Sequence, residues 1–564
     1  MPDRGRALSR LLDILPEGVA PVLMTGMTSG SLDAANLQVL LSGFDWDAHR
    51  NVVEDLLRAL LPVEELVPEV YAKWRPVVRD GIAFVGARLS PDRLVPKLIE
   101  QLALRETAPL EDRVMLFISR IPTLQKIGQI VSRNPDLDAK FRSRLELLEE
   151  GIREVTEPEI RAEIERGLAS QLADQLLELE PGLYAEGSVS ALMRFKRRFP
   201  GSSEPLTGVL KVLKPFITRH FQEDLALLEE LANFFEANRN NYDLDQLNLR
   251  AILDNVRELF ERETDFVNER ANLMGARFRY TGVPGIRVPQ PLSELSTETI
   301  TAMTEEPSVK IVEAFADDPQ RRAGLARNLA ECLVARPLFS WEASSPFHAD
   351  PHAGNLRVDE ATGDIVLLDW ALTGSLTEDD RRNLILLFVM LPLRDEGHVQ
   401  KALLGLSLSK TDATRDLLKQ EIERFMDSLP LGSIPGSGSL TSLVGRLLSA
   451  GAQFSGQFLI FRKMLFTLQD LITQLSPGVT IERVVSEYAL THRLRNVRCK
   501  GVAADSFRIP LRGRDFFSIG LSVQTLLPRG WLQTVRSIAR SLGAIQPPAA
   551  KSALEPAHKA SEED

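Results

Sequence analysis

The stretch FHADPHAGNLRVDEATGDIVLLDW, residues 347–370, carries three polar residues whose types and spacing suit phosphoryl transfer. Asp350 is followed at the fifth position by Asn355, and Asp369 ends the apolar run IVLL. In a kinase-type site the first acid faces the reacting group, while the amide and the last acid hold metal against nucleotide phosphates. Mg²⁺ suits this role because it is a hard cation that selects oxygen ligands. The stretch therefore predicts a nucleotide site with Asn355 and Asp369 as metal ligands.

The same stretch allows a second interpretation, because His348 and His352 alternate with Asp350 as in some metal hydrolases. The chain has only seven histidines, and the others are scattered without ligand spacing. Zinc and di-metal hydrolases need more clustered nitrogen ligands. A metal-dependent hydrolase at HADPH stays an alternative, and Asp369 taken alone could be a capping or turn residue.

Upstream residues supply the other parts of a nucleotide site. Lys211 lies in the alternating segment TGVLKVLKP, and Glu263 and Glu269 lie in the helix candidate 261–273. A lysine that faces a dry phosphate pocket needs a carboxylate to hold its position and charge. We therefore expect Lys211 to pair with one of these two acids, although most glutamates on helices are simply solvated.

The elements that must position these residues are mostly helical. Apolar residues recur at helical spacing over 31–120, 137–180 and 216–275. Strand-like stretches are few and cluster in the middle of the chain, at 184–195, 206–213, 298–304, 355–358 and 364–369. This distribution predicts an α+β protein in which a small β-containing lobe precedes a helical lobe. The Pro/Gly/Ser-rich segment 429–440 is expected to be a loop, and the tail from Gln546 to be disordered.

Composition excludes several classes of protein. The 564 residues are 44% hydrophobic and 26% charged with a net charge of −11, which argues against nucleic-acid binding. The two cysteines, Cys332 and Cys499, cannot form a disulfide framework and fit a reducing cytoplasm. The N-terminus lacks the apolar core of a signal peptide, and the longest apolar run, 384–391, is too short to span a membrane. We expect a cytoplasmic protein whose membrane contact, if any, is peripheral.

Four motifs give the sequence a family resemblance. They are K-x-G-Q at 126–129, AEGS at 185–188, ETDFVNERAN at 263–272 and HADPHAGN at 348–355 with the downstream LLDW. With these motifs the chain, from about residue 120 to about 490, resembles the UbiB-like (AarF-domain) atypical protein-kinase family. The first and fourth motifs are specific, because ordinary protein kinases have neither.

The resemblance implies roles position by position. Asp350 matches the catalytic-loop acid, Asn355 and Asp369 match the metal ligands, and Lys211 matches the nucleotide-binding lysine. The AEGS loop, through Ala185, Gly187 and Ser188, takes the place of a Gly-rich phosphate loop.

The K-x-G-Q motif has a role of its own in the family. Lys126 and Gln129 match residues that fold over the active site from an N-terminal extension and block the groove for a protein substrate. Glu263 and Glu269 match the helix acids that pair with Lys211 and Lys126, in an order that the motifs leave open.

The resemblance also implies a domain order and a function. The fold would be a bilobal, kinase-like α+β fold. Its parts would be an N-terminal helical extension (1–120), a K-x-G-Q helical segment (121–180), a small lobe (181–310), a large lobe (311–490), and C-terminal helices with a disordered tail (491–564). The implied function is ATP and Mg²⁺ binding with ATPase or small-molecule kinase activity in ubiquinone or other isoprenoid-lipid metabolism. A lipid or a quinone-pathway protein would be a partner.

Two departures from the family pattern favour a further alternative, a nucleotide-binding pseudokinase scaffold with little turnover. Glu186 stands where the family more often has alanine, and it should repel polyphosphate unless it turns outward or meets Mg²⁺. Ala371 stands where the family has glycine, and alanine disfavours a positive φ. The basic, amphipathic segment 515–545 is expected to be a helix pair packed on the large lobe, with an interfacial membrane contact as the alternative.

Overall fold

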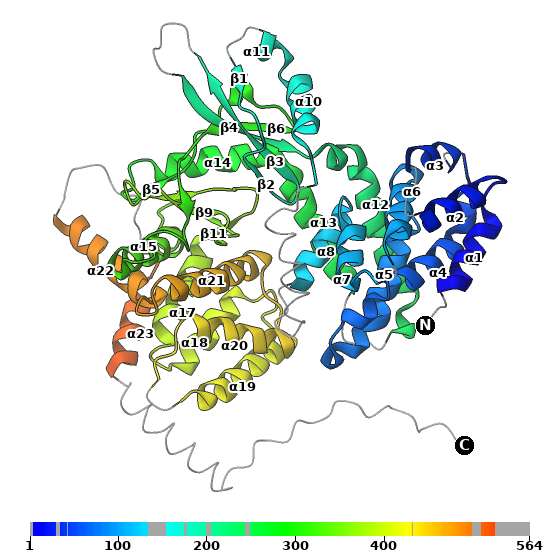
Figure 1. Ribbon diagram of the computed structural model, residues 1–564. Helices are drawn as coiled ribbons and strands as arrows, with labels where there is room; N and C mark the ends of the chain where they lie inside the picture. The colour runs from blue at the N-terminus through cyan, green and yellow to red at the C-terminus, as the bar shows by residue number, and fades with distance from the viewer. Residues whose placement is uncertain are drawn as a thin grey trace, which may run out of the picture. The chain divides into compact units, whose positions relative to one another are not determined.

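The chain divides into two compact units. Figure 1 labels the helices and strands that they contain. Unit 1 comprises residues 1–281, 288–307 and 369–371, and unit 2 comprises residues 282–287, 308–368 and 372–564. The computed structural model describes residues 4–29, 34–41, 43–105, 107–132, 154–173, 177–198, 205–242, 249–430, 433–498 and 509–524.

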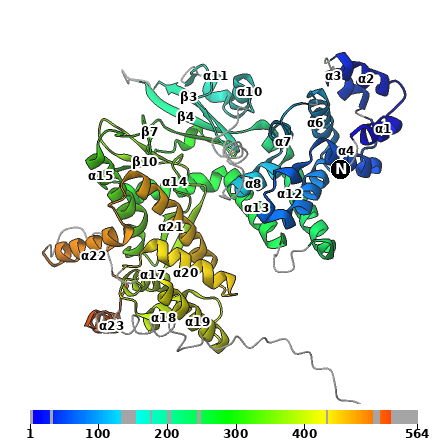
Figure 2. The same ribbon diagram turned by 60° about the horizontal axis from the view of Figure 1, so that its bottom comes forward.

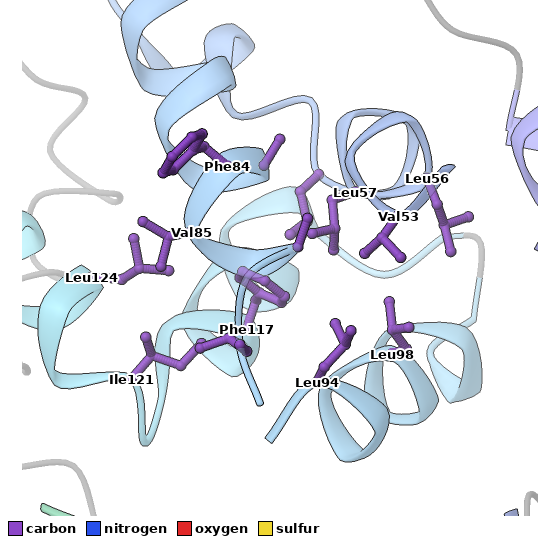
Figure 3. Close-up of a cluster of buried hydrophobic side chains, with 14 of the residues drawn as sticks. Val53, Leu56, Leu57, Phe84, Val85, Leu94, Leu98, Phe117, Ile121 and Leu124 are labelled. Atoms are coloured by element: carbon purple, nitrogen blue, oxygen red, sulfur yellow. The ribbon is translucent and has the colours of Figure 1, made fainter. Parts of the chain in front are cut away.

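Unit 1 begins with a bundle of short helices around a large apolar core. In α4, RNVVEDLLRAL places Val53, Leu56, Leu57 and Leu60 on one helical face, and all four are buried. Figure 3 shows this cluster, which reaches Leu124 at the start of α8. The α-helices of unit 1 are α1 Arg4–Ile14, α2 Val19–Ser29, α3 Ala34–Leu41, α4 Arg50–Leu60, α5 Arg75–Gly86, α6 Pro91–Ala103, α7 Leu110–Ile118, α8 Pro122–Ser132, α10 Glu157–Gly167, α11 Ala169–Ala173, α12 Pro215–Ala237, α13 Leu249–Thr264 and α14 Phe266–Tyr280.

The core of this bundle extends onto α12 and α13, so the N-terminal helices and these two helices form one packed body. Leu227, Leu228 and Leu231 of α12 and Val256 of α13 belong to the same apolar cluster. Figure 2 shows α8 beside α12 and α13. The helix that carries Lys126 is thereby fixed within unit 1.

Unit 1 also contains an antiparallel sheet in the order β1-β3-β4-β6, with β2 paired to β3. Its strands are β1 Leu177–Leu179, β2 Ala185–Glu186, β3 Ser190–Arg197, β4 Leu206–Leu213 and β6 Ile300–Thr304. Leu210 and Val212 of β4 pack with Ile300 and Ala302 in a second apolar cluster. Because side chains alternate along a strand, Lys211 points to the opposite face of the sheet.

Unit 2 is mainly helical and contains two small sheets. Strand β10 pairs parallel with β5 and antiparallel with β9, β9 pairs with β7, and β11 pairs with β8. The strands are β5 Ile286–Arg287, β7 Val309–Lys310, β8 Ser344–His348, β9 Leu356–Val358, β10 Ile365–Leu367 and β11 Thr373–Thr377. The α-helices are α15 Pro319–Ala330, α16 Arg336–Leu338, α17 Glu378–Met390, α18 Glu396–Leu406, α19 Asp412–Ser428, α20 Ser437–Ser449, α21 Gly456–Leu475, α22 Ile481–Arg498 and α23 Gly513–Gln524.

The structure confirms a strand in each predicted strand stretch and corrects three other predictions. Of the stretch 137–180 with predicted helical patterns, residues 137–153 and 174–176 lie outside the described residues, 157–173 hold α10 and α11, and 177–179 form β1, which pairs with β3. The single helix predicted over 261–273 is two helices, since α13 ends at Thr264 and Asp265 caps α14. The predicted loop 429–440 gives way to α20 at Ser437.

The C-terminal prediction is tested only in part. Helix α23 packs against α17, where Nε and Nη2 of Arg382 donate to the two carboxylate oxygens of Asp515 at 2.7 and 2.6 Å. Residues 525–545, the rest of the predicted helix pair, lie outside the described residues. Within the described part of the chain, no helix combines the length and the apolar character needed to cross a bilayer.

Candidate active site

A buried lysine and two carboxylates form the centre of the candidate site in unit 1. Lys211 Nζ on β4 lies 2.6 Å from Glu269 Oε1 on α14 and 3.6 Å from Asp369 Oδ2. The side chains of Lys211 and Glu269 are 10% and 4% exposed, whereas that of Asp369 is 41% exposed. Of the two candidate acids, Glu269 is therefore the partner of Lys211.

Burial and the presence of two carboxylates beside one lysine shift the pKa values in this cluster. Burial raises the pKa of Glu269 to about 6, and the Lys211 ammonium offsets this only in part. Burial alone would lower the pKa of Lys211, but the carboxylates of Asp369 and Glu269 outweigh it, so the pKa of Lys211 is raised. Lys211 thus stays charged at neutral pH, and two carboxylates face one ammonium.

The segment that carries Asp369 is fixed in unit 1 by α14. Asn272 Nδ2 donates to the Trp370 carbonyl at 3.1 Å, and the Trp370 ring, 2% exposed, lies 6.2 Å from that of Tyr280. Asp369 itself has a φ of +52°, and its Oδ1 accepts from the Ala371 N–H at 3.2 Å. The residue with the left-handed conformation is thus Asp369, a type that tolerates it, and the φ of Ala371 is not positive.

Lys126 belongs to a second polar cluster in unit 1. Its Nζ binds Glu263 Oε2 and donates to Ser188 Oγ at 3.2 Å, and Ser188 Oγ lies 3.4 Å from the same carboxylate oxygen. Glu263 is therefore the partner of Lys126, which answers the question that the motifs left open. Gln129 belongs to α8, but its side chain lies outside the described residues.

The AEGS segment begins with the two residues of β2, Ala185 and Glu186. The Glu186 carboxylate does not turn outward, because its Oε1 lies 2.9 Å from the buried Lys214 Nζ. A Cβ placed on Gly187 would come no closer than 3.6 Å to Ser190 Oγ, so the protein's own packing does not demand glycine there. Ala185 pairs with Leu192 of β3 and is exposed.

In unit 2, Asp350 is held by the loop between β8 and β9. Both ring nitrogens of His348 bind the backbone: Nε2 donates to the Leu368 carbonyl at 3.0 Å, and Nδ1 accepts from the Asp350 N–H at 3.2 Å. Asn355 Nδ2 donates to the Asp350 carbonyl at 3.2 Å, and no described group donates to its Oδ1. The Asn355 oxygen is therefore the amide atom suited to a cation.

Sequence reasoning missed Lys463 of α21, whose Nζ donates to Asp350 Oδ1 at 3.2 Å. It also missed Lys214, which binds Glu186 and Glu154. No sequence spacing links Lys463 to Asp350. A salt bridge between positions more than 100 residues apart leaves no local pattern.

The donors present suit Mg²⁺ and give little support to a hydrolase. The carboxylates of unit 1 and the Asn355 oxygen of unit 2 are hard ligands, and Glu269 Oε2 is buried without a hydrogen-bond partner in the described structure. Among the described residues no three His, Cys, Asp or Glu side chains gather as a metal site. Backbone bonds also occupy both ring nitrogens of His348, one of the two histidines that the hydrolase alternative would use.

Comparison with known proteins finds one matching family model and several relatives. Residues 147–403 match the ABC1 atypical kinase-like domain. Protein ACTIVITY OF BC1 COMPLEX KINASE 7, chloroplastic, of Arabidopsis thaliana is 24% identical over 376 residues, which are 65% of this chain and 52% of that protein. The probable protein kinase UbiB of Pasteurella multocida is 25% identical over 375 residues, 64% of this chain and 70% of that protein.

Two proteins of Mycobacterium tuberculosis are also similar. An uncharacterized protein is 27% identical over 412 residues, 71% of this chain and 78% of its own length. A solved structure, an Rv3197–erythromycin complex, is 14% identical to this chain and has a TM-score of 0.43. The match covers 71% of this chain and 98% of that one.

The chain spans about half the length of the Arabidopsis relative. The expected α+β, bilobal kinase-like fold class is confirmed by the matched domain and by the observed mixture of helices and small sheets. Residues 147–403 resemble an ABC1 atypical kinase-like domain, and together with the named relatives this match supports the expected resemblance to UbiB-like atypical kinases.

Proposed function

We propose that the protein binds ATP with Mg²⁺ and acts as an atypical kinase or ATPase that supports isoprenoid-quinone or other lipid metabolism. The observation that carries the proposal is the buried pair of Lys211 and Glu269 with Asp369 at 3.6 Å. A permanently charged strand lysine beside a half-exposed carboxylate is the arrangement that kinase-type sites use to bind phosphates and metal.

Each residue then has a task. Asp369 and Asn355 would hold Mg²⁺, which neutralises charge on the transferring phosphoryl group when it is bound. Lys211 would bind the α- and β-phosphates, and Glu269 would hold the lysine in place. Asp350 would accept the proton of the attacking hydroxyl or water.

A pseudokinase scaffold is the second candidate, and one observation favours it. Oδ1 of Asp350, the proposed base, is already bound by Lys463 at 3.2 Å. A carboxylate held by an ammonium is a weaker proton acceptor. The two candidates share nucleotide binding and differ in turnover.

A thermal-shift measurement with Asp369→Asn tests nucleotide binding. ATP with Mg²⁺ should raise the melting temperature of the wild type, because a ligand of the native state stabilises it by RT ln(1 + [L]/Kd). Asp369→Asn should abolish the part of the shift that needs Mg²⁺ and keep the Mg²⁺-independent part. An undiminished shift in the variant would exclude Asp369 as a metal ligand.

Phosphate release from ATP then separates the two candidates. Turnover that is lost in Asp350→Asn supports the kinase or ATPase, and binding without turnover supports the scaffold. The role in lipid metabolism is tested by the isoprenoid-quinone content of cells that lack the protein, which should fall and recover with the wild-type chain.

A further inference from the structure

A buried lysine in unit 1, Lys214, joins the AEGS loop to the segment that precedes α10. Lys214 Nζ lies 2.8 Å from Glu154 Oε2 and 2.9 Å from Glu186 Oε1, and the three side chains are 1%, 3% and 6% exposed. Glu186 Oε1 also accepts from the Glu154 backbone N–H at 2.8 Å. These bonds are shielded from water and salt, unlike those of a surface ion pair.

Glu154 is bound in turn to the start of α8. Its Oε1 accepts from Gln125 Nε2 and, at 2.8 Å, from the Arg120 backbone N–H. The next residue of α8, Lys126, binds Ser188 on the other side of the loop. Lys126 thus binds the loop directly at Ser188, whereas Gln125 is connected to Glu186 only through Glu154. The preceding Leu124 anchors α8 in the apolar core (Figure 3).

This arrangement is costly for the fold. Two carboxylates share one ammonium, and Glu186 Oε2 is buried with no hydrogen-bond partner among the described residues. An unsatisfied buried carboxylate oxygen destabilises the native state. Without Glu186, Lys214 and Glu154 would form a balanced pair. Where a sequence breaks the rules of packing in this way, a functional reason is expected.

We propose that Glu186 is a positioning residue that, through Lys214 and Glu154, fixes the loop 185–189 to α8 so that the loop is preformed for nucleotide phosphates. This inference rests on the proposed function. Lys214 offsets part of the charge of Glu186 and holds its carboxylate in place. A loop that is ordered before binding saves the entropy that a mobile loop would lose when it closes on the ligand.

The test compares Glu186→Ala with Glu294→Ala in the full chain. Glu294 binds Arg197 at the other end of β3, so its variant breaks an ion pair of the same strand away from the loop. By calorimetry, Glu186→Ala should weaken Mg²⁺–ATP binding about three- to tenfold. Hydrogen exchange without nucleotide should become faster in 185–190 and 122–128 together. Glu294→Ala should change neither quantity.

Two results would overturn the inference. Unchanged affinity in Glu186→Ala would make the network purely structural, and tighter binding would show that Glu186 repels phosphate. If the wild type itself binds no Mg²⁺–ATP, the proposed function fails separately. In that case hydrogen exchange alone tests the inference. Faster exchange in 185–190 without faster exchange in 122–128 would refute the coupling between the loop and α8.

Discussion

At the scale of single residues, Glu269 is the group whose titration should be visible in stability. Its pKa rises from 4.5 to about 6 because it is buried. The folded state therefore binds more protons than the unfolded state between these values. The contribution of Glu269 to the free energy of unfolding is full below about pH 4.5 and is lost as the pH rises through about 6, a loss of about 2 kcal/mol.

Glu269→Gln tests this titration, since glutamine keeps the shape and does not ionise. The free energy of unfolding of the wild type, minus that of the variant, should fall by about 2 kcal/mol between pH 4.5 and pH 7. Urea unfolding at both pH values measures it. A difference that is constant with pH would mean that the pKa of Glu269 is the same in the folded and unfolded states, because the Lys211 ammonium fully compensates the effect of burial.

The second prediction at this scale concerns Lys463 and the rate of ATP hydrolysis. It binds Asp350 and has three N–H donors, so its ammonium can hold the carboxylate and also face a transferring phosphoryl group. Lys463→Ala should therefore lower kcat for ATP hydrolysis about tenfold with little change in KM, because the charge acts mainly in the transition state. Lys463→Arg should recover part of the loss.

The matched control for that prediction is Lys419→Ala, which removes an exposed lysine from α19 of the same unit. The control should leave kcat unchanged. Faster ATP hydrolysis in Lys463→Ala would instead show that Lys463 prevents Asp350 from accepting a proton, as the scaffold alternative requires.

At the scale of elements, the sequence predicts what its local patterns encode. Alternation around Lys211 gives β4, and the apolar run before Asp369 gives β10. Short strands such as β5 and β7, two residues each, have too few residues for a period and exist only because β10 and β9 pair with them. Propensity favours helix up to residue 180, but pairing with β3 makes 177–179 a strand.

In the candidate site, too, local patterns indicate the residues but not their distant partners. The motifs indicate Lys211, Glu263 and Glu269, but spacing alone cannot choose the partner of each acid, because the break at Asp265 sets the direction in which α14 leaves α13. The bonds of Lys214 and Lys463 join distant segments and leave no trace in local sequence. Family resemblance thus predicts residues by position, whereas their partners need the structure.

At the scale of the whole molecule, the chain passes repeatedly between the two units, so neither unit is one continuous segment. Residues 288–307 and 369–371 return to unit 1 after the chain has entered unit 2. The first of these returns brings Leu292, Leu295, Ile300 and Ala302 into the apolar cluster under the sheet. Unit 1 should therefore depend on residues that follow its helices in sequence.

Two fragments test this dependence. Fragment 1–310 keeps β6 and its buried side chains, and it should unfold cooperatively on heating. Fragment 1–281 lacks them. Its free energy of unfolding should be lower by several kcal/mol, since each large apolar side chain removed from a core costs about 2–5 kcal/mol. Circular dichroism during heating measures both transitions. Equal melting temperatures would show that β6 is dispensable, and that the sheet of unit 1 is complete without the returning chain.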